Sequence, residues 1–279
     1  MIKVRDLSYR YESGNEPALN GIDLEIENGE YLAVIGPIGC GKTTLIRHLN
    51  GLLIPSGGEV SVDGMDTRDR ENLKRIRQKV GMVFQNPDNQ IVGMSVEEDV
   101  AFGPGNLALS RHEIRERVNA ALTLVGLEGY KDRAPYSLSS GEKQLVAIAG
   151  VLAMDPDYII LDEPTAHLDP LTAKKVLRVM AGLHGKGISI CQVSHSMDEI
   201  VAADRVLIMS RGEITLQGTP SEVFRDPPAL KGLGLELPPA AEIMWRLKGR
   251  GIEVRADIVT LEEACAELAG LIDGSQIRR

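Results

Sequence analysis

The chain has 279 residues, of which 43% are apolar and 25% charged, and its net charge is −9 at pH 7. This is an ordinary globular mixture, long enough for one large domain with an appendage or for two domains. Nucleic-acid-binding proteins usually carry a basic stripe, whereas basic runs here span only a few residues, so we expect no DNA or RNA partner. Three widely spaced cysteines, Cys40, Cys191 and Cys265, argue against a disulfide framework and fit a reducing compartment.

The sequence offers little that could enter a membrane. The N-terminal stretch MIKVRDLSYRY has charges where a signal peptide has an apolar run. The most apolar stretch, residues 145–154, is too short to cross a bilayer. We therefore expect a protein that is soluble by itself and that reaches a membrane only through a partner.

Strand-like runs alternate with helix-like segments along the chain. Alternation of apolar and polar residues predicts half-buried strands at 2–7 and 22–27, and a short strand between glycines is expected at 58–64. Continuous apolar runs predict buried strands of a parallel sheet at 31–36, 80–84, 157–163 and 187–195. Residues 86–154 are mostly helical in pattern, with Ser110 as one expected helix cap. This order predicts an α/β fold with a mainly parallel sheet.

The composition changes after residue 224. Residues 225–243 carry several prolines and glycines, which is typical of a junction. Two helix-like segments follow, at about 239–249 and 260–272. We expect a main domain over residues 1–228, with a helical subdomain at about 86–154, and a small α-rich appendage over residues 229–279.

The stretch GPIGCGKTT, residues 36–44, matches the phosphate-loop motif G-x-x-x-x-G-K-[ST] between an apolar strand and a helix. Its glycines let backbone N–H groups surround phosphate oxygens, and the following helix adds its positive N-terminal end. Lys42 can reach the β- and γ-phosphates, and Thr43 offers a hydroxyl to Mg²⁺. A glycine-rich turn with a solvated lysine is disfavoured by this spacing and context. The expected nucleotide-binding residues are Gly36, Pro37, Ile38, Gly39, Cys40, Gly41, Lys42, Thr43 and Thr44.

Two carboxylates end the apolar run YIILDE, residues 158–163. Asp162 fits a Mg²⁺ ligand that acts through water. Glu163 could accept a proton from, or orient, a water that attacks the γ-phosphate. Alone, the pair would more simply end a strand; together with a phosphate loop it favours nucleotide hydrolysis.

The stretch SLSSGEKQ, residues 137–144, allows two interpretations. Ser140 and Lys143 match S-x-x-K, which can mark a serine nucleophile with a lysine base. Ser139 and Glu142 match S-x-x-E, which caps a helix. The S-D-N and K-T-G motifs that accompany the nucleophile are absent, so the capping interpretation is favoured.

With these motifs in order, residues 2–225 resemble the ATP-binding-cassette (ABC) ATPase family. The resemblance implies a stacking aromatic for adenine, a glutamine near Mg²⁺, a signature peptide, a D-loop and a switch histidine. These positions are Tyr11 (with Tyr9 as the weaker alternative), Gln85, residues 138–142, residues 166–169 and His195.

The family resemblance also implies a mechanism. Two ATPase domains pair head to tail, and each ATP lies between the phosphate loop of one domain and the signature peptide of the other. Ser139, Ser140 and Gly141 are then expected to contact the nucleotide of a second subunit. Catalytic roles are expected for Lys42, Gln85, Glu163 and His195, and Mg²⁺ contacts for Thr43, Gln85 and Asp162. Without the resemblance, His195 would more often be a structural hydrogen-bonding residue.

The signature peptide departs from the common L-S-G-G-Q, because Ser140 and Glu142 replace a glycine and the glutamine. Ser140 adds a Cβ and Glu142 a negative charge close to where a phosphate is expected. A helix cap is typically worth about 1 kcal/mol, so Glu142 can instead serve its own helix. We expect a working but slower contribution to the second site.

A narrower resemblance joins residues 85–109 and 230–268 to the ATPases of energy-coupling-factor transporters, which import vitamins or metal ions such as cobalt and nickel. It implies ATP and Mg²⁺, a second ATPase subunit, alike or different, a transmembrane coupling subunit and a membrane-embedded substrate-capture subunit. The chain would lie at the cytoplasmic face of the membrane as a peripheral subunit. The alternatives are another ABC importer or exporter, a soluble ABC clamp acting on DNA or ribosomes, and a regulatory subunit with little turnover.

Overall fold

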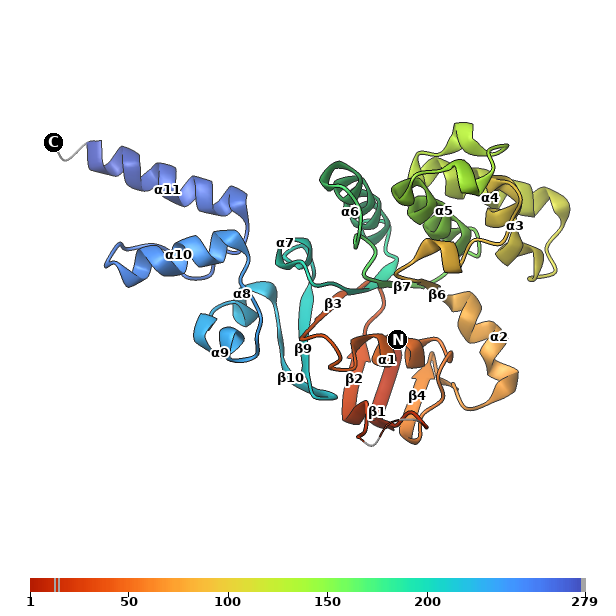
Figure 1. The fold of residues 1–279 in the computed structure, drawn as a ribbon, viewed down its shortest axis with the longest axis horizontal. Helices are drawn as coiled ribbons and strands as arrows, with labels where there is room; N and C mark the ends of the chain where they lie inside the picture. Colours follow the sequence, from red (N-terminus) through yellow and green to blue (C-terminus); the bar gives the residue numbers. More distant parts are fainter. Residues whose placement is uncertain (13, 15, 277–279) are drawn as a thin grey trace.

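The computed structural model describes residues 1–12, 14 and 16–276, which form two sheets flanked by helices (Figure 1). The antiparallel sheet has the strand order β2-β1-β4-β5, and the larger sheet has the order β10-β9-β3-β8-β7-β6. The strands are β1 Ile2–Tyr9, β2 Leu19–Ile26, β3 Tyr31–Ile35, β4 Gly57–Val62, β5 Met65–Asp66, β6 Val80–Val83, β7 Tyr158–Asp162, β8 Ser189–Val193, β9 Arg205–Ser210 and β10 Glu213–Gly218.

Eleven α-helices lie in the described part of the chain. They are α1 Lys42–Leu49, α2 Arg70–Lys79, α3 Val96–Gly105, α4 Arg111–Val125, α5 Ser140–Leu152, α6 Pro170–His184, α7 Met197–Ile200, α8 Pro220–Val223, α9 Pro227–Gly232, α10 Pro239–Gly249 and α11 Leu261–Gln276. Short 3₁₀ turns lie at Pro87–Asn89, Glu128–Tyr130 and Pro135–Ser137.

The larger sheet is parallel except at one edge. Strands β6, β7, β8, β3 and β9 run parallel to their neighbours, and β10 closes the sheet antiparallel to β9. Every residue of β3, β7 and β8 is buried, as expected of strands covered on both faces. The predicted α/β class with a mainly parallel sheet and an N-terminal antiparallel part is confirmed.

Side chains of the parallel strands alternate between two cores. Ala33 and Ile35 of β3 belong to a core shared with helices α4, α5 and α6, whereas Leu32 and Val34 belong to a core shared with α1 and the antiparallel sheet. Burying a Leu or Val side chain contributes about 1.5–3 kcal/mol, so the alternation fixes which face each helix covers. The strands are therefore packed on both faces, and this packing fixes the positions of the loops at their carboxyl ends.

The helical stretch predicted at 86–154 contains α3, α4 and α5, which lie together to one side of the sheets (Figure 1). Ser110 caps α4: its hydroxyl accepts the Glu113 N–H, and the Glu113 carboxylate accepts the Ser110 N–H. The sequence predicted this cap. Within the described residues, no helix combines the length and the apolar character needed to cross a membrane.

The junction expected at residues 225–243 contains a helix, α9, that was not predicted from the sequence. Asp226 caps α9 through the Ala229 N–H, and prolines occupy the first helical positions, where a missing N–H costs nothing. The expected boundary at residue 228 therefore falls inside α9. Leu230, Leu235 and Leu237 join the large core, as does Ala241 of α10. Helices α10 and α11 extend away from the sheets and also share a small core of their own (Figure 1).

Two leucines of α4 give a matched test of this packing. Leu122 is fully buried, whereas Leu124 is 37% exposed on the same helix. Leu122→Ala should lower the free energy of unfolding by about 2–5 kcal/mol, because it removes apolar contacts and leaves a cavity. Leu124→Ala should cost less than about 1 kcal/mol. Urea unfolding of both variants measures the difference, and equal losses would contradict the described core.

Candidate nucleotide-binding and hydrolysis site

The phosphate loop joins β3 to α1, and its backbone requires glycine at two positions. Gly36 has φ 151° and Gly41 has φ 107°, values that side-chain-bearing residues rarely adopt. A Cβ at Gly36 would lie 2.2 Å from the Met209 carbonyl oxygen, and a Cβ at Gly41 would lie 2.5 Å from that of Ala18. The loop is therefore pressed against neighbouring backbone.

The N-terminus of α1 is free to meet an anion. Among the residues that the structure describes, no side chain caps Gly41, so the start of this helix can face phosphate oxygens. The Lys42 side chain is buried, and its Nζ donates to the carbonyl oxygens of Gly36 at 2.8 Å and Pro37 at 3.0 Å. A lysine held across the loop places its charge beside any phosphate that the loop binds.

Thr43 and Asp162 bring two oxygen ligands together from separate elements. The Thr43 hydroxyl, in the first turn of α1, donates to Asp162 Oδ1 at 3.1 Å, at the end of β7. Burial raises the pKa of Asp162, and the charge of Glu163 raises it further, while the bond from Thr43 opposes both. Mg²⁺ takes one or two carboxylate or hydroxyl oxygens together with phosphate oxygens and water, so these residues fit it.

Two predicted residues, Gln85 and His195, both contact the carboxylate of a third, Glu163. Glu163 Oε1 lies 2.8 Å from His195 Nε2, and Glu163 Oε2 accepts a hydrogen bond from Gln85 Nε2 at 2.8 Å. Gln85 lies just beyond β6, Glu163 directly after β7 and His195 just beyond β8. Because these strands are neighbours in the sheet, their carboxyl ends bring the three side chains to the same edge.

The backbone at Glu163 is held in an unusual conformation. Its φ is 50°, in the left-handed region that costs a non-glycine residue about 1–3 kcal/mol. The Glu163 N–H donates to the Val193 carbonyl oxygen at 3.0 Å, which ties the end of β7 to β8. Strain of this kind persists where the surrounding structure holds it, and here it aims the carboxylate between Gln85 and His195.

Tyr11 lies beside the phosphate loop. Its hydroxyl is 3.1 Å from Thr44 Oγ1, and the residue is 37% exposed. Tyr9 is less exposed and packs edge-on against both Tyr11 and His48, with ring centroids 5.0 Å and 4.7 Å apart. Of the two tyrosines, Tyr11 is the more exposed and stays the predicted residue for stacking on adenine.

The capping interpretation of residues 137–144 is confirmed. The Ser139 hydroxyl accepts the Glu142 N–H at 3.3 Å, and the Glu142 carboxylate accepts the Ser139 N–H at 2.8 Å, at the start of α5. This backbone bond is the main cause that lowers the Glu142 pKa. Lys143 Nζ pairs with Asp88 at 2.6 Å, so its ammonium is engaged by a carboxylate and does not serve Ser140 as a base.

The signature peptide exposes its serines and buries its glycine. Ser139 and Ser140 are exposed, whereas a Cβ on Gly141 would lie 1.9 Å from Thr172 Cγ2 in α6. Helix α5 belongs to the helical group on one side, and α1 lies beneath the sheet beside the antiparallel strands (Figure 1). The N-terminal ends of α1 and α5 in one chain therefore belong to different parts of the molecule.

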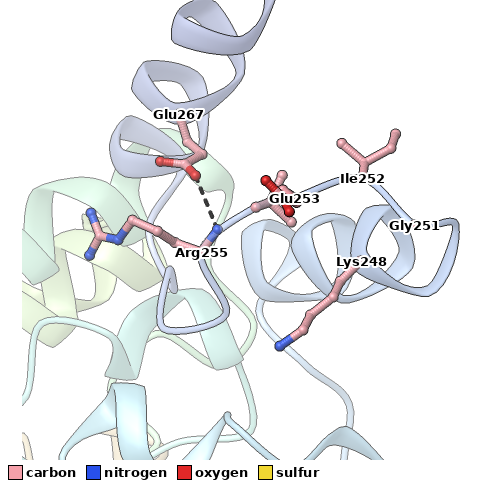
Figure 2. A pocket seen from close by; sticks show the side chains of 7 residues that line it. Lys248, Gly251, Ile252, Glu253, Arg255 and Glu267 are labelled. Atoms are coloured by element: carbon pink, nitrogen blue, oxygen red, sulfur yellow. Dashed lines mark hydrogen bonds between the residues drawn. The ribbon is translucent and has the colours of Figure 1, made fainter.

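A separate cavity of about 510 Å³ lies in the C-terminal region between α10 and α11 (Figure 2). Its charged lining includes Lys248, Glu253, Arg255 and Glu267, and the Glu267 carboxylate accepts the Arg255 N–H at 3.0 Å. The residues that line this cavity include no predicted nucleotide-binding residue. The cavity is therefore distinct from the candidate site.

Sequence reasoning missed a polar cluster behind the site. The hydroxyls of Thr165, two residues after Glu163, and of Ser194, one residue before His195, both donate to the Glu199 carboxylate. The one signal available was a carboxylate four residues after His195. That spacing alone does not show which residues the carboxylate meets.

The fold and the site together define a phosphate-loop ATPase. Residues 19–166, more than half of the chain, match the family model described as "ABC transporter". The chain belongs to the ABC transporter family, and it is an ATPase of that family, as the sequence predicted.

The similar proteins include the cobalt import ATP-binding protein CbiO of Syntrophus aciditrophicus, 52% identical over 96% of each chain. The energy-coupling factor transporter ATP-binding protein EcfA1 of Clostridium novyi is 46% identical and covers 97% of this chain and 98% of its own. These relatives agree with the predicted energy-coupling-factor type.

Solved structures give the same result. CbiO1 of Clostridium perfringens, described as part of the ABC transporter complex cbiONQ, superposes with a TM-score of 0.75 at 40% identity, over 88% of this chain and 98% of that one. The cassette MJ0796, solved as a dimer bound to ADP and Pi, has a TM-score of 0.72 at 31% identity, over 78% of this chain and 98% of that one. The predicted fold class is confirmed.

Proposed function

We propose that the chain hydrolyses ATP at the edge formed by β3, β8, β7 and β6, and thereby energises an uptake transporter of the energy-coupling-factor type. The observation that carries this proposal is the Glu163 carboxylate, held between Gln85 and His195 at 2.8 Å on each side. Glu163 accepts a proton from, or orients, the attacking water, and His195 donates to the γ-phosphate. The chemistry is phosphoryl transfer to water.

The nucleotide is bound by the phosphate loop. Lys42 and the backbone N–H groups of residues 38–44 hold the phosphates, and the Tyr11 ring stacks on the adenine. Thr43, Asp162 and Gln85 would hold Mg²⁺, which neutralises phosphate charge when bound. The Thr43–Asp162 hydrogen bond of 3.1 Å supports this ligand set, because it already places two of the three side chains together.

A second ABC ATPase subunit completes the site in this proposal. The exposed Ser139 and Ser140 and the first N–H groups of α5, including that of Gly141, would cover the γ-phosphate of that subunit's ATP. Closure then depends on the γ-phosphate and reverses after hydrolysis. We further propose that the appendage, residues 229–279, helps to hold the two subunits together, since Trp245 and Leu261 expose apolar surface there.

The membrane partner is proposed to dock beside Gln85. Met94, Phe102 and Tyr136 are large, apolar and exposed, and Met94 and Tyr136 line a hollow that also includes Asp88 and Lys143. Apolar patches with a polar rim are typical of interaction surfaces. The partner would be a transmembrane coupling subunit that works with a membrane-embedded substrate-capture subunit, and the chain would be peripheral at the cytoplasmic face.

The relatives' names suggest cobalt as one candidate substrate. No residue of the nucleotide site would touch that substrate. Purification of the membrane complex tests the partner proposal: a coupling subunit together with a small capture subunit would support it. Absence of both would favour another type of ABC importer or exporter.

Glu163→Gln tests the proposed hydrolysis residue. The amide keeps the shape of the side chain but cannot accept a proton, so turnover should fall by about 10²-fold or more while ATP-dependent dimers persist. Phosphate release and size-exclusion chromatography measure the two effects. Asp157→Asn, just before the opposite end of β7, is the matched control and should leave turnover near that of the parent chain. Unchanged activity in Glu163→Gln would refute the assigned role.

The double change Ser140→Gly with Glu142→Gln tests the signature peptide. Gln can still cap α5 through the Ser139 N–H, while the added Cβ and the negative charge are removed. Turnover should rise by roughly two- to tenfold, because the charge no longer opposes the bound anion. Glu113→Gln changes the equivalent residue of the α4 cap and should leave turnover unchanged. Equal turnover in the double variant and the parent would show that neither departure weakens the site.

A further inference from the structure

The Glu199 carboxylate gathers hydrogen bonds from three other positions in the chain. Its Oε1 accepts from the Thr165 hydroxyl at 2.7 Å. Its Oε2 accepts from the Ser194 hydroxyl at 2.9 Å and from Gln192 Nε2 at 3.2 Å. Hydrogen bonds to an ionised acceptor are roughly twice as strong as those between neutral groups, so this carboxylate is a firm link.

Two of the three donors lie on the two loops that carry the hydrolysis residues, and the third lies in β8. Thr165 lies two residues after Glu163, on the way to α6, and Ser194 immediately precedes His195. Gln192 belongs to β8 and is fully buried, and its Oε1 accepts a hydrogen bond from the Tyr31 hydroxyl of β3. Glu199 therefore connects the loop after β7, the loop after β8 and the core of the sheet.

The hydrogen-bond network ends inside the sheet at the Tyr31 hydroxyl. Burial raises the pKa of Tyr31, and the nearby Glu199 charge raises it further. Tyr31 therefore remains a neutral donor to Gln192, whose amide then donates to Glu199. The chain of hydrogen bonds runs from the sheet interior to the outer loops, with each donor aimed at an acceptor.

From this geometry we propose that Glu199 is a positioning residue for ATP hydrolysis, which holds His195 and Glu163 at hydrogen-bond distance. The proposal rests on the roles proposed above for those two residues. The backbone already ties the loops once, through the Glu163 N–H and the Val193 carbonyl oxygen. Through Thr165 and Ser194, Glu199 adds a second tie between the same two loops, next to the residues that make the Glu163–His195 contact.

Loss of the carboxylate should release the loops without disturbing nucleotide binding. The Ser194 hydroxyl has another acceptor within reach, the Ser196 carbonyl oxygen at 3.4 Å, and would turn toward it. Thr165 would lose the bond that holds its loop against α7. The phosphate loop and Tyr11 make no hydrogen bond to Glu199 among the described residues, so ATP affinity should change little.

The test separates kcat from KM in two variants of the full chain. Glu199→Met keeps the length of the side chain but removes both acceptors, and should lower kcat by about 10- to 100-fold with KM for ATP within about twofold. Glu199→Gln keeps one acceptor oxygen for Thr165 and should recover part of that loss. Thermal unfolding of each variant establishes that the measured protein is folded.

Glu30→Gln is the matched control for a structural effect. The Glu30 carboxylate also lies at the sheet, where it accepts from Arg205 Nε at 2.7 Å and from the Glu27 N–H at 2.8 Å, at the opposite end of β3. It should lose thermal stability with kcat unchanged. If Glu199→Met retains full kcat, or if Glu30→Gln loses as much kcat for the same loss of stability, the positioning role is wrong.

Glu163→Gln, measured in parallel, separates a failure of the positioning proposal from a failure of the proposed function. If Glu163→Gln abolishes turnover while both Glu199 variants retain it, the positioning proposal fails and the proposed function stands. If Glu163→Gln retains turnover, the proposed function fails, and with it the premise of the positioning role. Loss of turnover in Glu163→Gln, with the graded kcat loss in the Glu199 variants, supports both.

Discussion

Four parallel strands that end at one edge of a sheet are the constraint on which this site depends. Strands β6, β7, β8 and β3 are neighbours, so the residues that follow them are brought close together although they are distant in the sequence. The phosphate loop, the Asp162–Glu163 pair, Gln85 and His195 each occupy one of these strand ends. Two apolar cores, one on each face of the sheet, keep the strands in register. They therefore fix the relative positions of the site residues.

Negative and positive groups lie on opposite sides of that sheet edge. Asp162 and Glu163 are adjacent carboxylates, and burial raises the pKa of the first. Lys42 and the N–H groups at the start of α1 supply positive potential for phosphate on the other side of the same edge. A nucleotide with its cation would add charges of both signs between these groups, which is consistent with a site built for a phosphate–metal pair.

The sequence predicted the parts of the site that depend on local pattern. A phosphate loop, a helix cap and a strand that ends in two carboxylates are each contained within about ten residues, and the structure has the caps at Ser110 and Ser139 as expected. Helix α9 was missed because its prolines suggest a junction, although proline is well tolerated in the first turn. The Glu199 cluster was missed because its bond to Thr165 spans 34 positions and forms only when the sheet is assembled.

In the proposed function, one chain holds only half of each composite site, and a second subunit's signature peptide completes it. The most direct measurement is ATP turnover per chain as a function of protein concentration, from dilute to concentrated samples at fixed saturating ATP and Mg²⁺. A site completed by a second copy predicts turnover per chain that rises with concentration and reaches a plateau as dimers form. Measurable turnover per chain that stays constant down to the lowest concentration, with the protein monomeric throughout, would contradict the account.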